Sequence, residues 1–232
     1  MQERPLKVEL HSHSGDDPSD NISYSSERLI DEAARYGYDA LAITNHDSQS
    51  HNERLAAYAR ERGLLLIKGM ELTYERQHIV LLNFDRAWEL KSPEDIMKMK
   101  GPDNLVLAAH PYFPWAPSCG RLLVSNPRLF DAVEFSHLYN HRINFNKKAV
   151  ARAAELGLPL VGTSDAHTLG QLGYTYTLVE SERTPGAIMA AVKAGRCEVV
   201  TEPFPLSSLI GVIARMKYAN LTRIIKNALG GK

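Results

Sequence analysis

Short apolar runs that alternate with amphipathic segments restrict the fold of this chain more than any other feature of its sequence. The runs that we predict as strands are residues 7–10, 39–44, 64–68, 78–84, 105–109, 131–135 and 159–161. Between them, apolar residues at helical spacing predict helices over residues 26–35, 52–62, 93–100 and 143–156. Apolar strands that alternate with helices are typical of a parallel sheet covered on both faces. About seven such units in roughly 170 residues favour a closed α/β barrel over an open sheet.

Length and charge narrow the class of protein. The 232 residues include 27 Lys and Arg and 27 Asp and Glu, so the formal net charge is zero. This balance argues against a protein that binds nucleic acid mainly by neutralising its phosphates. The glycine-rich motifs of nucleotide-binding sheets do not occur in the sequence. No apolar stretch is long enough for a membrane span or a signal peptide, so we expect a cytoplasmic protein without a membrane partner.

The chain beyond residue 168 is predicted to pack against the barrel. We expect strands over residues 174–179 and 197–201, a helix over 185–194, and a C-terminal helix from about 207 to 229. The last helix has an apolar face typical of a packing or oligomer contact, and its basic end is either solvated or in contact with an anionic partner. No shift in composition marks a domain boundary, so we predict a single domain over residues 1–232.

Histidines and carboxylates follow the predicted strands at their carboxyl ends. In an α/β barrel these ends open onto one face, where the active site lies. The residues placed there are His11, His13, His46, Glu71, His110, His137, Asp165 and His167. His51 and His141 lie in polar segments and are expected at the surface. His78 begins its strand, which would place it at the opposite rim of a parallel barrel.

The joint pattern of these residues indicates a metal site. One histidine alone, or Glu71 alone, is more often a core or surface residue, but so many at successive strand ends are not expected by chance. Residues i and i+2 of a strand point to the same side, so His11 and His13 can bind one ion, as can Asp165 and His167 if strand geometry persists there. Imidazoles with a few carboxylates suit Zn, Mn or Fe. The ligands outnumber those of one tetrahedral site, so two or three metal ions are predicted.

Six short motifs, in the same order, resemble those of the PHP (polymerase and histidinol phosphatase) family. They are ELHSHS at residues 9–14, AITNHD at 42–47, GME at 69–71, AHP at 109–111, EFSH at 134–137 and SDAH at 164–167. Each motif alone is weak, whereas six in order over residues 7–168 are specific. The resemblance implies a distorted seven-stranded (β/α)7 barrel of TIM-like type that carries a trinuclear metal site.

Matched by position, the resemblance also implies a set of ligands. They are His11, His13, His46, Glu71, His110, His137, Asp165 and His167, with Glu71 expected to bridge two metals. A ninth ligand is implied in the loop after the first motif. Asp20, preceded by Ser19, matches it better than its rival Asp17.

The chemistry implied by the resemblance is hydrolysis of phosphate esters. Asp20, Glu71 and Asp165 are negative, so two or three divalent ions leave the pocket positive enough for a phosphate or sulfate. A metal-bound hydroxide would then attack phosphorus while the ions stabilise the attacking and leaving oxygens. We predict these three carboxylates as catalytic residues, together with Arg142, which would contact a second phosphate. Arg121 is the alternative for that contact.

The predicted substrate is a phosphate ester of a small molecule or nucleotide. The aromatic segment 112–117 after His110 would either stack on a base or ring of the substrate or pack over the barrel mouth. Two alternatives stay open, a nuclease or exonuclease and a catalytically silent metal-binding module. No basic groove is visible in the sequence, which argues against the nuclease, and the complete ligand set argues against the silent module.

Overall fold

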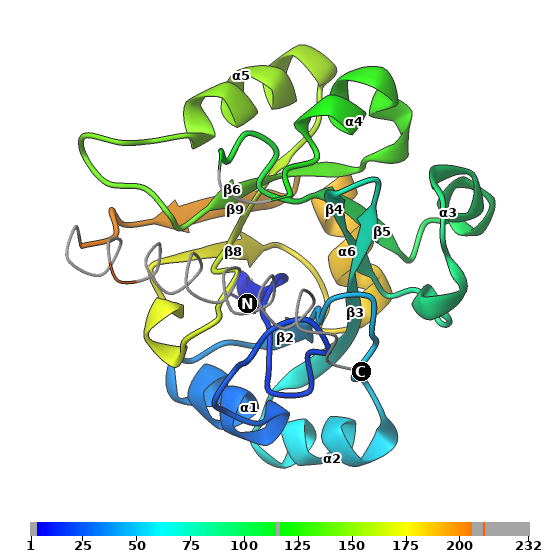
Figure 1. Cartoon of the computed structure of the whole chain (residues 1–232). Coiled ribbons are helices and arrows are strands. Elements are labelled where there is room, and N and C mark those ends of the chain that lie inside the picture. Colours follow the sequence, from blue (N-terminus) through cyan, green and yellow to red (C-terminus); the bar gives the residue numbers. More distant parts are fainter. Residues whose placement is uncertain (1–3, 115–116, 206–210, 212–232) are drawn as a thin grey trace, which may run out of the picture.

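A mixed sheet curls into a nearly closed barrel at the centre of the molecule (Figure 1). This computed structural model describes residues 4–114, 117–205 and 211. Within them the strands are β1 (Leu6–Glu9), β2 (Ala40–Ile43), β3 (Leu65–Tyr74), β4 (Gln77–Leu82), β5 (Leu105–Ala108), β6 (Ala132–Ser136), β7 (Leu160–Thr163), β8 (Thr175–Val179) and β9 (Cys197–Thr201). Their order in the sheet is β7-β6-β5-β4-β3-β2-β1-β8-β9. The α/β class is confirmed. The seven-stranded (β/α)7 detail is wrong, because the sheet has nine strands and mixed directions.

The first change of strand direction arises where β3 passes into β4 without a helix. Tyr74 of β3 pairs with Gln77 of β4, which leaves a turn of two residues, Glu75 and Arg76. Both have positive φ, 47° and 61°, as tight hairpin turns require. Such turns usually contain Asn or Gly, so this hairpin has no clear signal in the sequence. As a result β4 runs antiparallel to both β3 and β5. Independently of this hairpin, β8 is antiparallel to both β1 and β9.

The barrel nearly closes where β7 approaches β8 and β9. The hydroxyl of Thr177 on β8 donates a hydrogen bond of 2.9 Å to the carbonyl oxygen of Gly162 on β7. A β-carbon at position 162 would lie 2.7 Å from the carbonyl oxygen of Tyr176 and 2.8 Å from a methyl carbon of Val199. Glycine at this position therefore permits the close approach of the strands.

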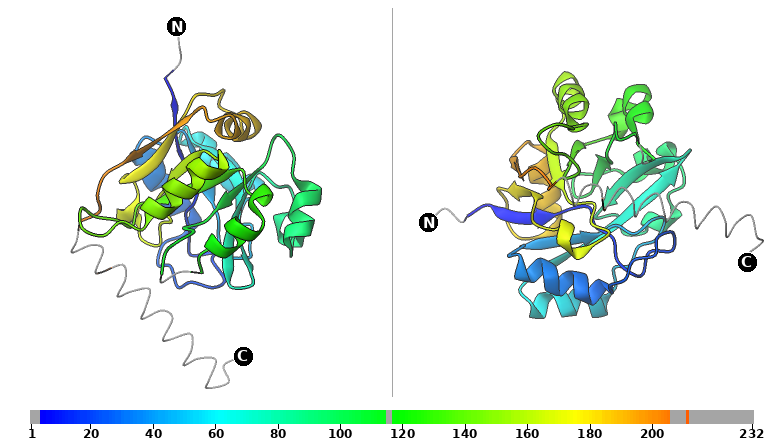
Figure 2. Two further views of the ribbon diagram at one scale, coloured as in Figure 1. Left: turned by 90° about the horizontal axis from the view of Figure 1, so that it is seen from above. Right: turned by 60° about the vertical axis from the view of Figure 1, so that its left-hand side comes forward.

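Helices cover the outside of the barrel. They are α1 (Ser26–Arg35), α2 (Glu53–Glu61), α3 (Pro93–Met99), α4 (Gly120–Ser125), α5 (Asn146–Leu156) and α6 (Pro185–Lys193). The pair α1 and α2 lies on one side of the sheet, and α4 and α5 lie on the opposite side (Figures 1 and 2). The Ser25 side chain caps α1, and Gly157 ends α5 in a left-handed conformation. The short α4 was not among the predicted helices.

Aliphatic side chains and the polar site follow one another along the same face of the strands. Ile67 belongs to a buried cluster that also includes Val8, Leu107 and Ile188 of α6. Glu71 lies four residues after Ile67 on β3, so its side chain is on the same face. Glu134 lies two residues after Ala132 of this cluster on β6, so it also shares a face with the cluster. The core thus ends in a layer of polar groups toward the carboxyl ends of these strands.

Some predictions concern residues outside the described ranges. These are the C-terminal helix over about 207–229 with its basic end, apart from residue 211, and Trp115 and Ala116 of the aromatic segment. Among the described helices, none has the length and apolar character needed to cross a lipid bilayer.

Candidate metal centre

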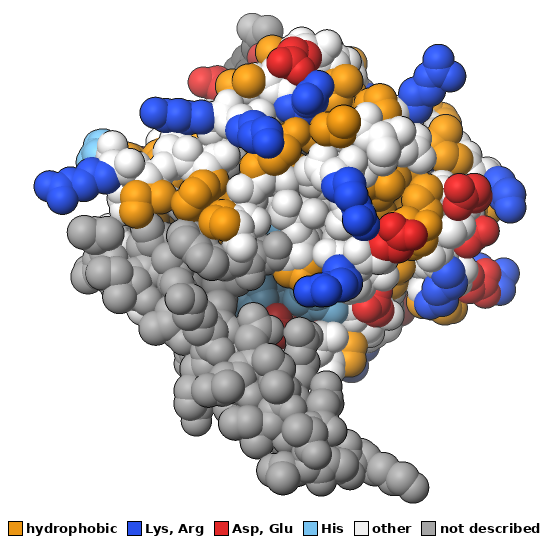
Figure 3. All heavy atoms as spheres, turned by 45° about the horizontal axis from the view of Figure 1, so that its top comes forward, with side chains coloured by type: hydrophobic (Ala, Val, Ile, Leu, Met, Phe, Trp, Pro, Cys, Tyr) orange, Lys and Arg blue, Asp and Glu red, His pale blue; other side chains and the backbone are white. Residues whose placement is uncertain are grey.

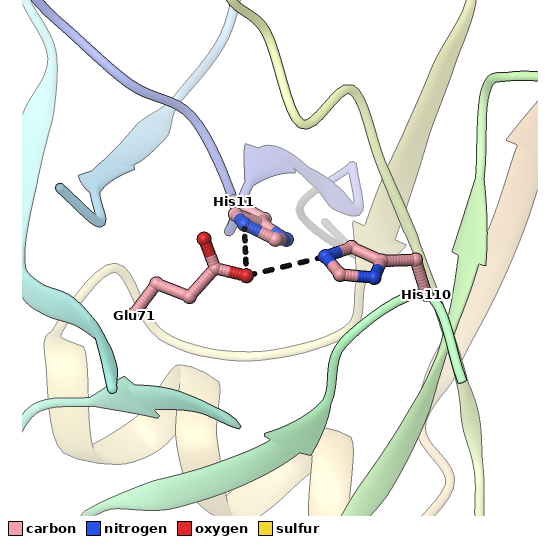
Figure 4. Close-up of side chains that lie close together, drawn as sticks. All are labelled: His11, Glu71 and His110. Carbon is pink, nitrogen blue, oxygen red and sulfur yellow. Dashed lines mark hydrogen bonds and ion pairs between the residues drawn. The ribbon is translucent and has the colours of Figure 1, made fainter. Parts of the chain in front are cut away.

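The carboxylate of Glu71 lies at the centre of a group of imidazole rings. Glu71 is buried in β3, and five imidazole nitrogens lie 2.9–3.4 Å from its two oxygens. Near Oε1 are His78 Nδ1 (2.9 Å), His110 Nε2 (3.2 Å) and His11 Nε2 (3.4 Å), and near Oε2 are His46 Nε2 (3.1 Å) and His13 Nε2 (3.4 Å). Figure 4 shows the rings of His11 and His110 directed to the same oxygen. Rings from distant parts of the chain therefore converge on one carboxylate.

Asp165 forms a second point of convergence beside Glu71. Its Oδ1 lies 3.2 Å from His13 Nε2 and 3.5 Å from His11 Nε2. Asp165 follows β7 with a φ of 42°, so the strand geometry on which the pairing of Asp165 with His167 depended does not persist. His110 has a φ of 26°. Such conformations cost free energy in residues with a β-carbon and are concentrated at functional sites.

The loop between β1 and α1 supplies two carboxylates with different partners. Asp17 Oδ2 lies 3.0 Å from His13 Nδ1 and 2.9 Å from His46 Nδ1. Asp20 Oδ2 lies 2.8 Å from His167 Nε2 and 3.7 Å from His46 Nδ1. Both candidates for the loop ligand are therefore at the site, Asp17 fully buried and Asp20 at its edge.

The expected position of His78 at the opposite rim is wrong. Because β4 runs antiparallel to β3, the start of β4 lies beside the later part of β3, and His78 pairs with Thr73 across the hairpin. His78 Nδ1 is 2.9 Å from Glu71, closer than any other imidazole nitrogen around this carboxylate. Strand direction was the missing information. The turn at Glu75 and Arg76 sets this direction, and it contains none of the residues that usually mark such turns.

His137 lies apart from the rings around Glu71. Its Nε2 is 3.0 Å from Nε2 of Gln171, whose amide oxygen accepts hydrogen bonds from the backbone of His167 and Thr168. The Gln171 amide nitrogen therefore donates and His137 Nε2 accepts. In the described part of the chain, His137 joins none of the groups of three or more potential ligands. Its role as a ligand stays a prediction.

The two arginines considered for phosphate binding lie at the surface. Arg121 forms an ion pair of 3.2 Å with Glu75 of the hairpin. The backbone nitrogen of Arg142 donates to Asn140 Oδ1 at 2.8 Å, which fixes the main chain after β6, and the Arg142 side chain is exposed.

Two residues of the aromatic segment pack within the protein. Phe113 is buried, with its ring centroid 5.4 Å from that of Phe145. Tyr112 is partly buried, and Lys148 Nζ lies 4.4 Å from the centre of its ring. For these two residues the contacts favour packing over the barrel mouth, not stacking on a substrate.

The buried charges of the site shift the pKa values of its residues. Burial opposes protonation of His11, yet the carboxylates of Glu134 and Glu71 raise the pKa of His11 well above its usual range. Burial likewise opposes ionisation of Glu71, but the rings of His78 and His11 hold the pKa of this carboxyl well below its usual range. Ionised carboxylates thus lie among imidazoles and favour the protonated form of some of these rings. Divalent metal ions can take the place of the protons that the rings would bind.

A further carboxyl is buried next to the site. Glu9 Oε1 accepts hydrogen bonds from the backbone nitrogens of His11 (3.1 Å) and Ser164 (3.2 Å). Burial raises the pKa of Glu9 to about 8, against the lowering effect of these bonds. It was not among the predicted site residues.

The donor set and its spacing fit divalent metal ions. Ligands about 2.1 Å from one ion, at octahedral or tetrahedral angles, lie about 3.0–3.4 Å apart, close to the distances around Glu71. Glu71 belongs to two groups of potential ligands, one with His11 and His110 and one with His46 and His78. The other groups are His11, His13 and Asp165, and His13, Asp17 and His46. Imidazoles mixed with carboxylates suit Zn, Mn or Fe better than Ca or Mg.

One side of the site is open to solvent. The side chains of Asp20 and His167 are 29% and 24% exposed, whereas that of Glu71 is 1% exposed. Figure 3 shows histidine side chains at the bottom of a hollow in the surface. A ligand can therefore approach from the side of Asp20 and His167.

Comparisons with known proteins show which fold class this chain resembles. A family profile described as PHP-associated matches residues 144–197. The structure resembles that of a two-domain protein from Bacteroides vulgatus that contains a predicted PHP-like metal-dependent phosphoesterase, with a TM-score of 0.62, 22% identity, and coverage of 85% of this chain and 65% of the other. It also resembles Endonuclease Q in complex with a 27-mer duplex that has an abasic lesion at the active site, with a TM-score of 0.58, 17% identity, and coverage of 82% and 56%.

A segment of the chain is also similar in sequence to a DNA polymerase. The error-prone DNA polymerase of Nocardia farcinica is 40% identical over 66 residues, which are 28% of this chain and only 6% of the polymerase. The predicted resemblance to the PHP family is thereby confirmed, and the chain has the fold of PHP-like metal-dependent phosphoesterases.

Proposed function

We propose that this protein is a metal-dependent phosphoesterase that hydrolyses a phosphate ester of a small molecule or nucleotide. The observation that carries the proposal is the convergence of five imidazole nitrogens on the buried carboxylate of Glu71. The fold class supports the hydrolysis of phosphoesters. A cytoplasmic location stays a prediction from the sequence.

The ligand groups support a cluster of two or three divalent ions. Glu71 would be shared between ions, as its membership of two ligand groups favours. Asp165 would bind an ion with His11 and His13, and Asp20 would bind one with His167. Divalent ions bound in this way supply a water of lowered pKa and positive charge that stabilises phosphoryl oxygens.

The buried and the exposed residues of the site define where a substrate would enter. Burial of Glu71 keeps bulk water from one side of the site, so a phosphate enters from the side of Asp20 and His167. We assign catalysis to Asp20, Glu71 and Asp165, which set the position and net charge of the cluster. Arg142, exposed after β6, is assigned to a second phosphate of the substrate.

A nuclease is the second candidate function. The structural similarity to Endonuclease Q, which was solved with a DNA duplex, favours it. The zero net charge of the chain favours the small substrate.

The test begins with elemental analysis of the purified chain. Metal-free protein is prepared with a chelator and reloaded with Zn, Mn or Fe. Release of phosphate is then measured from p-nitrophenyl phosphate and from mononucleotides, and cleavage is measured on a labelled oligonucleotide. We expect turnover of the small esters only with metal, and its loss in His11→Ala and Asp165→Ala. His141→Ala, which changes an exposed histidine, serves as the control.

Three results would contradict the proposal. Cleavage of the oligonucleotide without hydrolysis of small esters would favour the nuclease. Bound metal without turnover of any substrate would favour the silent module. Near wild-type activity of His11→Ala or Asp165→Ala, with the fold unchanged, would overturn the role of that residue.

A further inference from the structure

We propose that two buried carboxylates, Asp17 and Glu134, are positioning residues that hold three histidines with Nδ1 toward the protein and Nε2 toward the metals. In this arrangement Asp20, not Asp17, is the metal ligand of the loop. The inference rests on the proposed metal centre but concerns residues that do not themselves bind the ions.

Asp17 binds two rings through the same side of each. Its Oδ2 accepts from Nδ1 of His13 (3.0 Å) and from Nδ1 of His46 (2.9 Å). The Nε2 atoms of the same rings lie 3.4 Å and 3.1 Å from Glu71 Oε2. A neutral imidazole that donates through Nδ1 has its lone pair on Nε2. Asp17 therefore selects the tautomer in which both lone pairs face the centre of the site.

The hydrogen bonds of Asp17 leave it little capacity to bind an ion. In addition to the two rings, Oδ2 accepts from the backbone nitrogen of His46 at 2.9 Å. Oδ1 accepts from the backbone nitrogens of Ser19 (2.8 Å) and Asp20 (3.1 Å). A carboxylate has about four lone-pair positions, and these contacts bring five N–H groups to it. The carboxylate of Asp17 is thus committed to protein donors.

Asp20, in contrast to Asp17, is partly exposed and is available to bind an ion. Its side chain is 29% exposed and contacts His167 Nε2, the nitrogen through which that ring can bind an ion. His167 Nδ1 lies 3.0 Å from the carbonyl oxygen of Asp165, to which it donates. Asp17 also fixes the backbone of Asp20, so one carboxylate places the other at the edge of the site.

Glu134 acts on His11 in the way that Asp17 acts on His13 and His46. Glu134 Oε1 lies 2.9 Å from His11 Nδ1, and both side chains are fully buried. The same oxygen accepts from the hydroxyl of Thr163, and Oε2 accepts from the backbone nitrogen of His110. Glu134 thereby orients the ring of His11 and holds the main chain of His110 in its positive-φ conformation.

The stoichiometry of metal binding distinguishes a positioning residue from a ligand. The experiment uses the full chain, made metal-free with a chelator and titrated with Zn²⁺ alone, in the wild type and in Asp17→Asn, Glu134→Gln and Asp20→Asn. For Asp17→Asn and Glu134→Gln we expect the wild-type number of ions at saturation, with affinity about 10- to 100-fold lower. For Asp20→Asn we expect fewer ions at saturation. Circular dichroism checks that each variant is folded.

Two outcomes of the titration would overturn the inference. A reduced number of ions at saturation in Asp17→Asn or Glu134→Gln would make that residue a ligand. An unchanged affinity would show that the residue has no role at the centre. If the wild type itself binds no Zn²⁺, the proposed function fails. The tautomers of the histidine rings, measured by NMR, still test the positioning.

The second measurement needs no variant. Long-range proton–nitrogen NMR of the chain labelled with ¹⁵N-histidine reports which ring nitrogen carries a proton. For His11, His13 and His46 we expect a proton on Nδ1 in both the metal-free and the Zn-loaded chain, with Nε2 unprotonated once Zn is bound. A ring that carries its only proton on Nε2 would contradict the inference for that histidine.

Discussion

The inner and outer parts of the metal centre differ in how the chain builds them. The inner part, Glu71, His11 and His13, is buried, and its rings are held by carboxylates beneath them. The outer part, Asp20 and His167, is about one-quarter exposed and comes from segments after β1 and β7. The inner part can therefore be rigid before any ion binds, whereas the outer part is where ions and substrate enter.

Glu71→Gln should abolish activity. The substitution keeps the shape of the side chain but removes the charge shared by two ligand groups, so the imidazoles around it lose their common anion. We expect turnover to fall at least about a thousandfold, which corresponds to ~4 kcal/mol. Phosphate release and metal content by elemental analysis measure the effect.

Asp20→Asn is the matched change in the outer part. It should leave the ions of the inner part bound, so its metal content should exceed that of Glu71→Gln. Equal loss of metal in the two variants would remove the distinction between inner and outer parts.

His78→Ala should lower metal affinity by about 10- to 100-fold, since it removes the imidazole closest to Glu71. His141→Ala is the control, because His141 is exposed and was expected at the surface. Titration with Zn²⁺ and phosphate release measure the effect. Equal affinities in the two variants would show that His78 contacts Glu71 without contributing to the centre.

The inner part was largely predictable because strand ends are visible in a sequence. His11, His13, Glu71 and His110 follow apolar runs, and the barrel brings the ends of such runs to one rim. His78 was not predictable in this way. Its contribution depends on the direction of β4, which a turn of Glu75 and Arg76 sets without a typical turn residue.

Sequence patterns could not predict the geometry of the loop or the buried hydrogen-bond partners of the histidines. Asp17 and Asp20 are three residues apart in a polar loop. The spacing does not distinguish their roles, whereas their hydrogen-bond partners in the structure do. Glu134 lies within an apolar strand, where nothing in the spacing indicates that it faces His11. The predicted number of strands was wrong because β8 and β9 join the sheet instead of packing outside it.

Glu9→Gln should change the pH dependence of stability in the metal-free chain. The pKa of Glu9 is raised from 4.5 to about 8 by burial, so the folded chain holds this proton more tightly than the unfolded chain. The free energy of unfolding therefore falls as pH rises from about 4.5 to about 8. Glutamine cannot ionise, so between pH 5 and 8 the variant should lose about 3–4 kcal/mol less stability than the wild type. Urea unfolding at both pH values measures this. Parallel pH profiles would mean that Glu9 is ionised in the folded chain.

Arg142→Ala should have the smallest effect, because an exposed guanidinium contributes little to binding. An exposed ion pair is worth about 0.2–1 kcal/mol, so we expect KM for a substrate with two phosphates to rise about two- to fivefold, with kcat unchanged. Arg121→Ala is the matched control, since Arg121 already pairs with Glu75 and should leave KM unchanged. A substrate with one phosphate should not distinguish the variants. If KM instead rises only in Arg121→Ala, the second phosphate binds near the β3–β4 hairpin and not near Arg142.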